Sequence, residues 1–273
     1  MNTPALLARI ADALDRLAPQ PPVQTDPNIG DSFVWDSNRF RPVPASAAQP
    51  LARFIGVDAQ KATLLANTAR HAKRLPAHDV LLWGSRGMGK SSLVRSVHRE
   101  LAATGLGLVQ VARDDIGSLP ALFRQLSGTE RRFLIFADDL SFEADEHQYK
   151  ALRSVLDGGI EARPDSVRIV VTSNRRHLIA REHADAEAAA AINARDLLDD
   201  RLALADRFGL SLGFHICDQP TYLAMVHGYA TAHGLAVDDA AAVAWALARG
   251  NRSGRVAWQY IQEIAGEAGV RLG

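Results

Sequence analysis

The chain has 273 residues, 47% of them hydrophobic, and its 31 basic side chains are balanced by 31 acidic ones. This hydrophobic content excludes a disordered chain and leaves room for one large or two modest domains. The zero net charge excludes a general attraction to nucleic acid or anionic lipid, so a nucleic-acid role would need a local basic patch. Cys217 is the only cysteine and cannot form an internal disulfide, which favours a reducing compartment.

The first fifty residues predict a helix followed by an extended connector. Apolar residues recur at helical spacing over 4–18, and this amphipathic helix either docks on its own chain or binds a partner. Prolines recur over 19–50 and the periodicity is lost, which predicts a connector. Its aromatic residues indicate that part of it lies on a surface. The sequence shows no signal-peptide pattern and no apolar run long enough for a membrane span. We therefore expect a cytoplasmic protein.

Strands and helices alternate in the middle of the chain. Short apolar runs predict strands over 80–83, 108–112, 133–137, 167–172 and 210–216. Periodic segments predict a helix that Asp58 caps, and further helices over 90–103, 119–126, 146–156 and 183–200. This order is typical of an α/β fold, here a parallel five-stranded sheet sandwiched by helices.

The pattern changes after Pro220. Helices are predicted over 222–233, 238–249 and 252–268, with no strand between them. They predict a small C-terminal helical subdomain. We therefore divide the chain into an N-terminal helix and connector (1–50), an α/β domain (51–216) and the helical subdomain (217–273).

A glycine-rich loop follows the first predicted strand of the α/β domain. It reads G-x-x-x-x-G-K-S from Gly84 to Ser91, the form of a phosphate-binding loop. Its glycines let the backbone take positive φ angles so that N–H groups converge on phosphate, Lys90 reaches the β and γ phosphates, and Ser91 binds Mg²⁺. A chance glycine turn is the alternative, which the flanking strand and helix disfavour. The residues expected to bind nucleotide are Gly84, Ser85, Arg86, Gly87, Met88, Gly89, Lys90, Ser91 and Ser92.

Polar residues end two later strands of the same sheet. Asp138 and Asp139 follow 133–137, and Asn174 follows 167–172. Ligands of open parallel sheets bind beyond the carboxyl ends of the strands, so these side chains are expected beside the phosphate loop. There Asp138 would bind Mg²⁺ together with Ser91, and Asn174 would contact the γ-phosphate or the attacking water.

With these motifs in place, the chain resembles the AAA+ ATPases over roughly residues 51–265. The phrases LLWGSRGMGKSSLV, FADDLSFE, VTSNRRHL and LADRFGL are similar to a bacterial AAA+ family known as a domain of unknown function, DUF815. The resemblance implies a sheet with strand order 5-1-4-3-2, a helical lid, and assembly into rings or partial rings with nucleotide at the subunit interfaces.

The resemblance also implies roles for single residues. Asn174 takes the sensor-1 position, Arg207 the arginine finger and Arg255 the sensor-2 arginine, while 54–57, with Ile55, lies where the family contacts adenine. Both arginines also have a simpler interpretation. Arg207 would pair with Asp206 at the surface, and Arg255 would be an exposed residue at the start of a helix.

One residue departs from the family pattern, because Asp139 stands where glutamate is common. Aspartate is one methylene shorter, so hydrolysis is expected to be slow unless the backbone brings the carboxylate closer or Glu143 replaces it. We expect an oligomeric, Mg²⁺-dependent ATPase that acts on a protein or nucleic-acid client. The main alternative is a slowly hydrolysing switch or adaptor; a nucleic-acid loader and a small-molecule kinase fit less well.

Overall fold

The structure is a computed structural model that describes residues 26–36, 38–44, 48–140, 152–156, 163–174 and 205–272, with isolated positions 3 and 9. The helices expected over 4–18 and 183–200 lie outside these ranges, as does Glu143. Of the helix expected over 146–156, only residues 152–156 are described, and they are helical.

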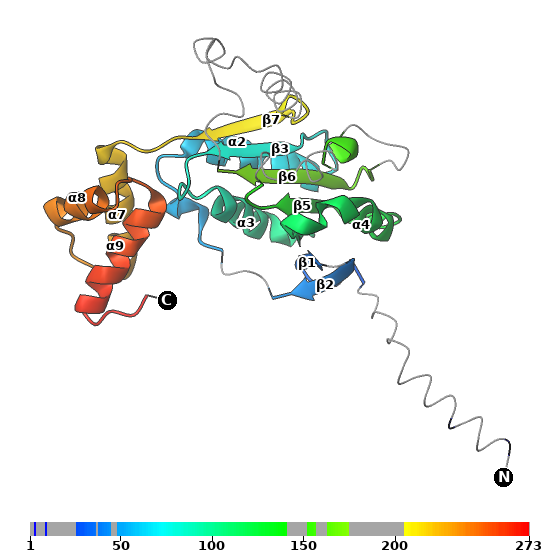
Figure 1. The fold of residues 1–273 in the computed structure, drawn as a ribbon, viewed down its shortest axis with the longest axis horizontal. Coiled ribbons are helices and arrows are strands. Elements are labelled where there is room, and N and C mark those ends of the chain that lie inside the picture. Colours follow the sequence, from blue (N-terminus) through cyan, green and yellow to red (C-terminus); the bar gives the residue numbers. More distant parts are fainter. Residues whose placement is uncertain are drawn as a thin grey trace, which may run out of the picture.

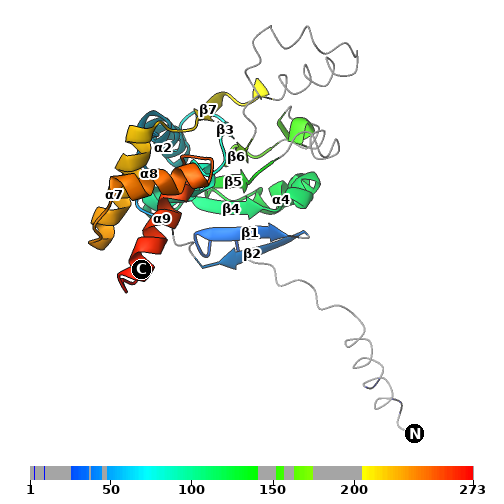
Figure 2. The same ribbon diagram turned by 60° about the vertical axis from the view of Figure 1, so that its left-hand side comes forward.

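Five parallel strands form the centre of the sheet. They are β3 (Val80–Gly84), β4 (Gly107–Val111), β5 (Phe133–Ala137), β6 (Val167–Ser173) and β7 (Leu210–Phe214). Their spatial order is β4-β5-β6-β3-β7, which confirms the order 5-1-4-3-2 (Figures 1 and 2). β5 is buried along its whole length, as its continuous apolar sequence predicts for a strand covered on both faces.

Two further strands extend the β4 edge, so the sheet has seven strands in the order β2-β1-β4-β5-β6-β3-β7. β1 (Ser32–Asp36) runs parallel to β4, and β2 (Arg39–Val43) pairs antiparallel with β1. The structure therefore corrects the prediction of an extended connector for this part of 19–50. Its aromatic residues are core residues: Phe33 and Trp35 are at most 1% exposed, and Phe33 stacks on Phe40 at 4.5 Å.

Helices cover both faces of the sheet, as predicted. α2 (Asp58–Ala72) and α3 (Lys90–Leu101) pack on one face, and α4 (Leu119–Leu126) on the other. Alternate side chains of β3 enter the two cores, with Val80 and Leu82 facing α3. Asp58 does not cap α2, because Val57 is the N-cap and Asp58 pairs with Lys61 at 2.7 Å within the first turn. Short 3₁₀ turns lie at Leu51–Arg53, Ala102–Thr104 and Arg113–Ser118.

Three helices follow the last strand and stand at one end of the sheet (Figures 1 and 2). They are α7 (Gln219–His233), α8 (Asp239–Ala248) and α9 (Gly254–Glu267), and we call them the lid helices. Each begins at a side-chain cap supplied by Asp218, Asp238 or Ser253. The lid and the α2/α3 face of the sheet share one continuous hydrophobic core.

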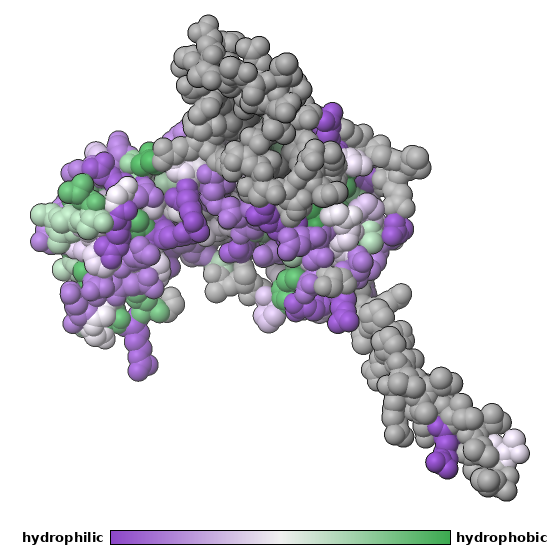
Figure 3. Space-filling view, in the orientation of Figure 1, coloured by the Kyte–Doolittle hydropathy of each residue, from purple (hydrophilic) through white to green (hydrophobic). Residues whose placement is uncertain are grey.

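On the face that Figure 3 shows, the described surface is mostly hydrophilic, with apolar side chains more frequent on the lid. Leu247 of α8 is 76% exposed, the highest value among the large hydrophobic residues described. None of the helices described is long and apolar enough to cross a membrane.

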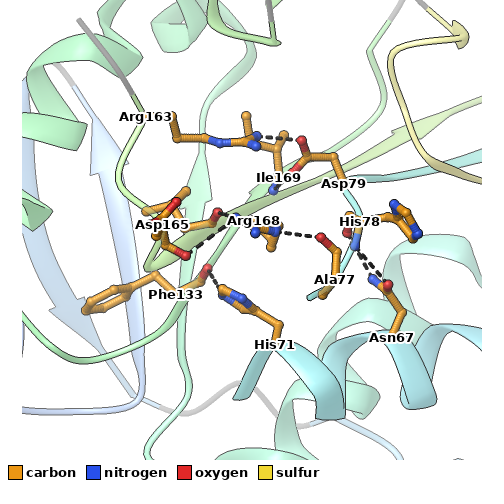
Figure 4. A network of polar contacts seen from close by, with 11 residues as sticks. Asn67, His71, Ala77, His78, Asp79, Phe133, Arg163, Asp165, Arg168 and Ile169 are labelled. Atoms are coloured by element: carbon orange, nitrogen blue, oxygen red, sulfur yellow. Dashed lines mark hydrogen bonds and ion pairs between the residues drawn. The ribbon is translucent and has the colours of Figure 1, made fainter. Parts of the chain in front are cut away.

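A polar network fixes the amino ends of the strands, opposite the glycine loop (Figure 4). Asn67 of α2 exchanges two hydrogen bonds with the backbone of His78, at 2.9 and 3.0 Å. His71, 2% exposed, contacts the carbonyl that begins β5 at 3.1 Å. The carboxylate of Asp79 accepts from Arg163 at 2.5 Å and from a backbone amide of β6 at 2.8 Å. These contacts hold α2 and the starts of β3, β5 and β6 in register.

Candidate nucleotide-binding site

The glycine loop joins β3 to α3, and its glycines have positive φ angles: 116° at Gly84, 81° at Gly87 and 86° at Gly89. At Gly84 a side chain is also sterically excluded, since a Cβ atom there would lie 2.1 Å from the carbonyl oxygen of Phe214. The next amide, that of Ser85, donates to the same carbonyl at 2.7 Å. The end of β7 thus fixes the start of the loop.

The loop offers unpartnered backbone donors. Within the described part of the chain, no acceptor is found for the amides of residues 86–89, and α3 begins immediately afterwards at Lys90. The first N–H groups of a helix also lack partners within the helix and carry its positive dipole end. This stretch therefore fits an anion, and it includes the loop residues predicted from sequence, with Arg86 exposed and Met88 buried.

Lys90 is buried beneath the loop, with 5% of its surface exposed. Its Nζ atom donates to the carbonyls of Gly84 and Ser85 and to Oδ1 of Asn174, each at 2.9 Å. Desolvation lowers the pKa of the ammonium group to about 8, although the charges of Asp139 and Asp138 favour the protonated form. A partly desolvated positive charge at this position attracts phosphate more strongly than one in water.

Asp138 lies against the first turn of α3. Its Oδ1 atom accepts from Ser91 Oγ at 2.5 Å and from Thr172 Oγ1 at 2.6 Å, and its Oδ2 atom lies 3.5 Å from a guanidinium nitrogen of Arg95. Ser91 and Asp138 thus place a hydroxyl and a carboxylate oxygen together. Hydroxyl, carboxylate and water oxygens are the ligands that Mg²⁺ takes in phosphate sites, so this donor set fits Mg²⁺.

Asp139 adopts an unusual backbone conformation, with φ at 52°. Its amide donates to Thr172 Oγ1 at 2.9 Å, and its carboxylate accepts from the side-chain Nδ2 of Asn174. Because Asn174 also accepts from Lys90, one amide side chain joins the loop lysine to the second acid. The predicted residues Lys90, Ser91, Asp138, Asp139 and Asn174 therefore form one connected hydrogen-bond network.

The lid contacts the glycine loop directly. The amide of Arg255, in the first turn of α9, donates to the carbonyl of Gly87 at 3.1 Å. A Cβ atom on Gly87 would lie 2.9 Å from Ser253 Oγ and 3.2 Å from Arg255 Cβ. The charge of Arg255 also contributes to lowering the pKa of Lys90, behind desolvation. The structure thus brings Arg255 to the loop, with its side chain exposed.

Residues 54–57 lie between the loop and the lid. A Cβ atom on Gly89 would lie 3.4 Å from the ring of Phe54, and one on Gly228 of α7 would lie 2.6 Å from Ile55 Cδ1. The segment predicted to contact adenine therefore borders both the loop and the first lid helix.

Arg207 is the predicted site residue that the structure does not bring to the others. It lies on the turn before β7, which runs parallel to β3. The turn is therefore at the amino end of the sheet, whereas the glycine loop is at the carboxyl end. Arg207 therefore lies at the end of the sheet opposite the glycine loop of its own chain.

Three residues at this site were missed by sequence reasoning: Arg95, Thr172 and Ser253. Arg95 stands four positions after Ser91, so helical periodicity could have placed both on the face of α3 that meets β5. Thr172 lies in a buried strand, and only the pairing of β6 with β5 brings it to the two acids.

The family comparison matches residues 30–268 to the family described as "Protein of unknown function (DUF815)". A search of curated proteins finds no match.

Among solved structures, the chain is similar to the Aeropyrum pernix Orc1 protein in complex with DNA, with a TM-score of 0.57 at 17% identity. That alignment covers 78% of this chain and 61% of the other. A proline-to-glycine mutant of Thermotoga maritima RuvB gives a TM-score of 0.50 at 19% identity, covering 76% of this chain and 62% of the other. The chain thus spans less than two thirds of each of these proteins, and the likeness concerns the fold. The chain belongs to the DUF815 family, and its fold is that of the AAA+ ATPases.

Proposed function

We propose that this protein binds ATP with Mg²⁺ at the glycine loop and hydrolyses it slowly to ADP and phosphate. The observation that carries the proposal is the network that joins Lys90, Ser91, Asp138, Asp139 and Asn174 beyond the ends of three adjacent strands. A small-molecule kinase would need the loop and the metal ligands, but it gives no reason for the contact between the lid and the loop.

Binding rests on two kinds of group in this chain. The free amides of residues 86–89 and the first turn of α3 hold phosphate oxygens, and Lys90 exchanges its backbone and Asn174 acceptors for the β and γ phosphates. Ser91 and Asp138 would hold Mg²⁺, which would offset the negative charge of the phosphates. Residues 54–57 cover the base on the side of the lid.

Hydrolysis rests on Asp139 and Asn174. Asn174 orients the attacking water and the γ-phosphate, and the Asp139 carboxylate accepts the water proton as the new phosphorus–oxygen bond forms and the bond to ADP breaks. The carboxylate of Asp139 accepts from Asn174, and that of Asp138 also pairs with Arg95. The contact between Asp139 and Asn174, and a side chain one methylene shorter than glutamate, favour slow turnover and a switch-like protein over a fast motor.

The position of Arg207 supports an oligomeric enzyme. An arginine at the amino end of the sheet reaches phosphate only in a neighbouring subunit, as in a ring or partial ring. The client, protein or nucleic acid, is not identified by this site. The RuvB structure is described as a branch migration motor, and the Orc1 structure as a complex with DNA. These descriptions apply to those two proteins.

Binding is tested by titrating a fluorescent ATP analogue into the full chain with and without Mg²⁺. The wild type should bind tightly only with Mg²⁺, and Lys90→Ala should bind at least about tenfold more weakly, since a charged hydrogen bond contributes about 1.5–3 kcal/mol. Arg70→Ala, at the far end of α2, is the control and should bind like wild type. Equal affinity of Lys90→Ala and wild type would refute the site.

A further inference from the structure

The two acids at the end of β5 are bound to β6 through a single hydroxyl group. Thr172 Oγ1 donates to Asp138 Oδ1 at 2.6 Å and accepts from the backbone amide of Asp139 at 2.9 Å. A threonine hydroxyl has one proton to donate and lone pairs to accept with. Here the hydroxyl proton of Thr172 is donated to the carboxylate of Asp138, and a lone pair of the same oxygen accepts from the backbone amide of Asp139.

The backbones of the same two strand ends are also bound together. The amide of Leu140 donates to the carbonyl of Thr172 at 2.8 Å, and Ser173 Oγ donates to the carbonyl of Leu140 at 3.0 Å. Asp139 lies between these contacts in the left-handed region, a conformation that non-glycine residues hold only when neighbouring contacts support it. Thr172 supplies the contact at Asp139 itself.

The hydroxyl belongs to a buried side chain, because Thr172 is 1% exposed and its neighbour Ser173 is fully buried. In the described part of the chain, Thr172 Oγ1 is the only acceptor found for the amide of Asp139. Removing the hydroxyl therefore removes the protein acceptor of that amide, and the loss of this hydrogen bond weakens the support for the left-handed conformation of Asp139.

We propose that Thr172 is a positioning residue for ATP hydrolysis, whose hydroxyl fixes the backbone of Asp139 and the carboxylate of Asp138 in one geometry. The proposal rests on the function proposed above. Loss of the Thr172 hydroxyl should affect Asp139 more than Asp138, because Ser91 also holds Asp138 Oδ1. Asn174 binds only the side chain of Asp139, so it cannot fix the backbone. Thr172 should therefore influence the rate of hydrolysis more than the binding of nucleotide.

The experiment compares Thr172→Val, which keeps the branched shape and removes the hydroxyl, with Thr172→Ser, which keeps the hydroxyl. In the nucleotide-free protein, the amide of Asp139 should exchange its hydrogen faster in Thr172→Val and at the wild-type rate in Thr172→Ser. The kcat for ATP should fall about 10–100-fold in Thr172→Val, the usual effect of losing a contact behind a catalytic or metal-binding group. The KM and the Mg²⁺ dependence of analogue binding should change much less than kcat, because Ser91 still holds Asp138, and Thr172→Ser should restore most of kcat.

Three results would overturn the positioning role: a Thr172→Val enzyme with wild-type kcat, a loss carried by KM instead, or a Thr172→Ser enzyme as slow as Thr172→Val. If Thr172→Val does not fold, Thr172→Ala removes the same hydroxyl without adding apolar volume and is judged by the same criteria. A wild type that hydrolyses ATP no faster than Lys90→Ala overturns the proposed function and this role with it, so the two failures are distinguishable.

Discussion

The backbone amide of Arg255 donates a hydrogen bond of 3.1 Å to the carbonyl of Gly87, so the last lid helix begins against the glycine loop. This main-chain contact would pass a change in the loop to the lid. The same contact explains why this loop position has no side chain, since a Cβ atom would meet Ser253 and Arg255.

Gly87→Ala should weaken ATP binding and detach the lid from the loop. Gly105→Ala is a matched control, because the two glycines have φ angles of 81° and 82° but nothing lies within 4 Å of a Cβ atom on Gly105. Both variants should lose about 1–2 kcal/mol of stability from left-handed strain. Thermal unfolding with and without Mg²⁺-ATP should show ligand stabilisation for Gly105→Ala only. Equal stabilisation of both variants would contradict the role of the contact.

Asp139→Glu should not speed hydrolysis, although it restores the residue that is common in AAA+ proteins. Asp139 has φ at 52°, and aspartate tolerates the left-handed region better than glutamate does. The longer side chain would also have to leave its contact with Asn174. We expect a rate at or below wild type in phosphate-release assays, and Asp139→Asn should bind ATP but not cleave it. A faster Asp139→Glu enzyme would show that the backbone does not compensate for the shorter side chain.

The stability of the protein should fall as the pH drops from about 6.5 towards 4. Burial lowers the pKa of His71 from 6.5 to about 4, although the contact of the ring with the β5 carbonyl acts to raise this pKa. Between these two pKa values the unfolded state binds a proton at His71 that the folded state does not bind. The free energy of unfolding therefore falls by up to about 1.4 kcal/mol for each unit by which the pH drops. Burial also lowers the pKa of His98, which adds in the same direction.

Urea unfolding at several pH values between 7.5 and 4.5 measures this effect. His71→Asn removes the titrating group and should reduce the slope of stability against pH by close to one proton. His227→Asn, at an exposed lid position, is the control and should leave most of the slope unchanged. An unchanged slope in His71→Asn would contradict the assignment.

The action of Arg207 across a subunit interface is tested by mixing inactive variants. Lys90→Ala removes the site of one subunit, and Arg207→Ala removes the group offered to its neighbour. An arginine finger contributes roughly 10³ to 10⁵ in rate, so each variant alone should be nearly inactive and mixed assemblies should recover part of the activity. Recovery at no mixing ratio would count against an intersubunit role.

The sequence was sufficient to predict the five central strands and the phosphate loop for physical reasons. A strand buried on both faces is apolar throughout, as 133–137 is, and a phosphate loop needs fixed residue types at fixed spacing. β2 was missed because Pro42 and two arginines interrupt its alternation, which an edge strand tolerates because one side has no sheet partner.

Other features of the site could not be predicted because they depend on packing between distant segments. Thr172 meets Asp138 and Asp139 across 34 and 33 positions of the sequence, and the contact exists only because β5 and β6 are neighbours. The lid contact at Gly87 joins segments still further apart. Asp139 could be recognised as an unusual residue, but its left-handed backbone is visible only in the structure.

The central claim, that Lys90 and its network form a site for ATP hydrolysis, is tested most directly by steady-state phosphate release from ATP and Mg²⁺. The wild type should release phosphate slowly but measurably, and Lys90→Ala should reduce the rate to the background without enzyme. A wild type whose rate does not exceed that of Lys90→Ala would contradict the account.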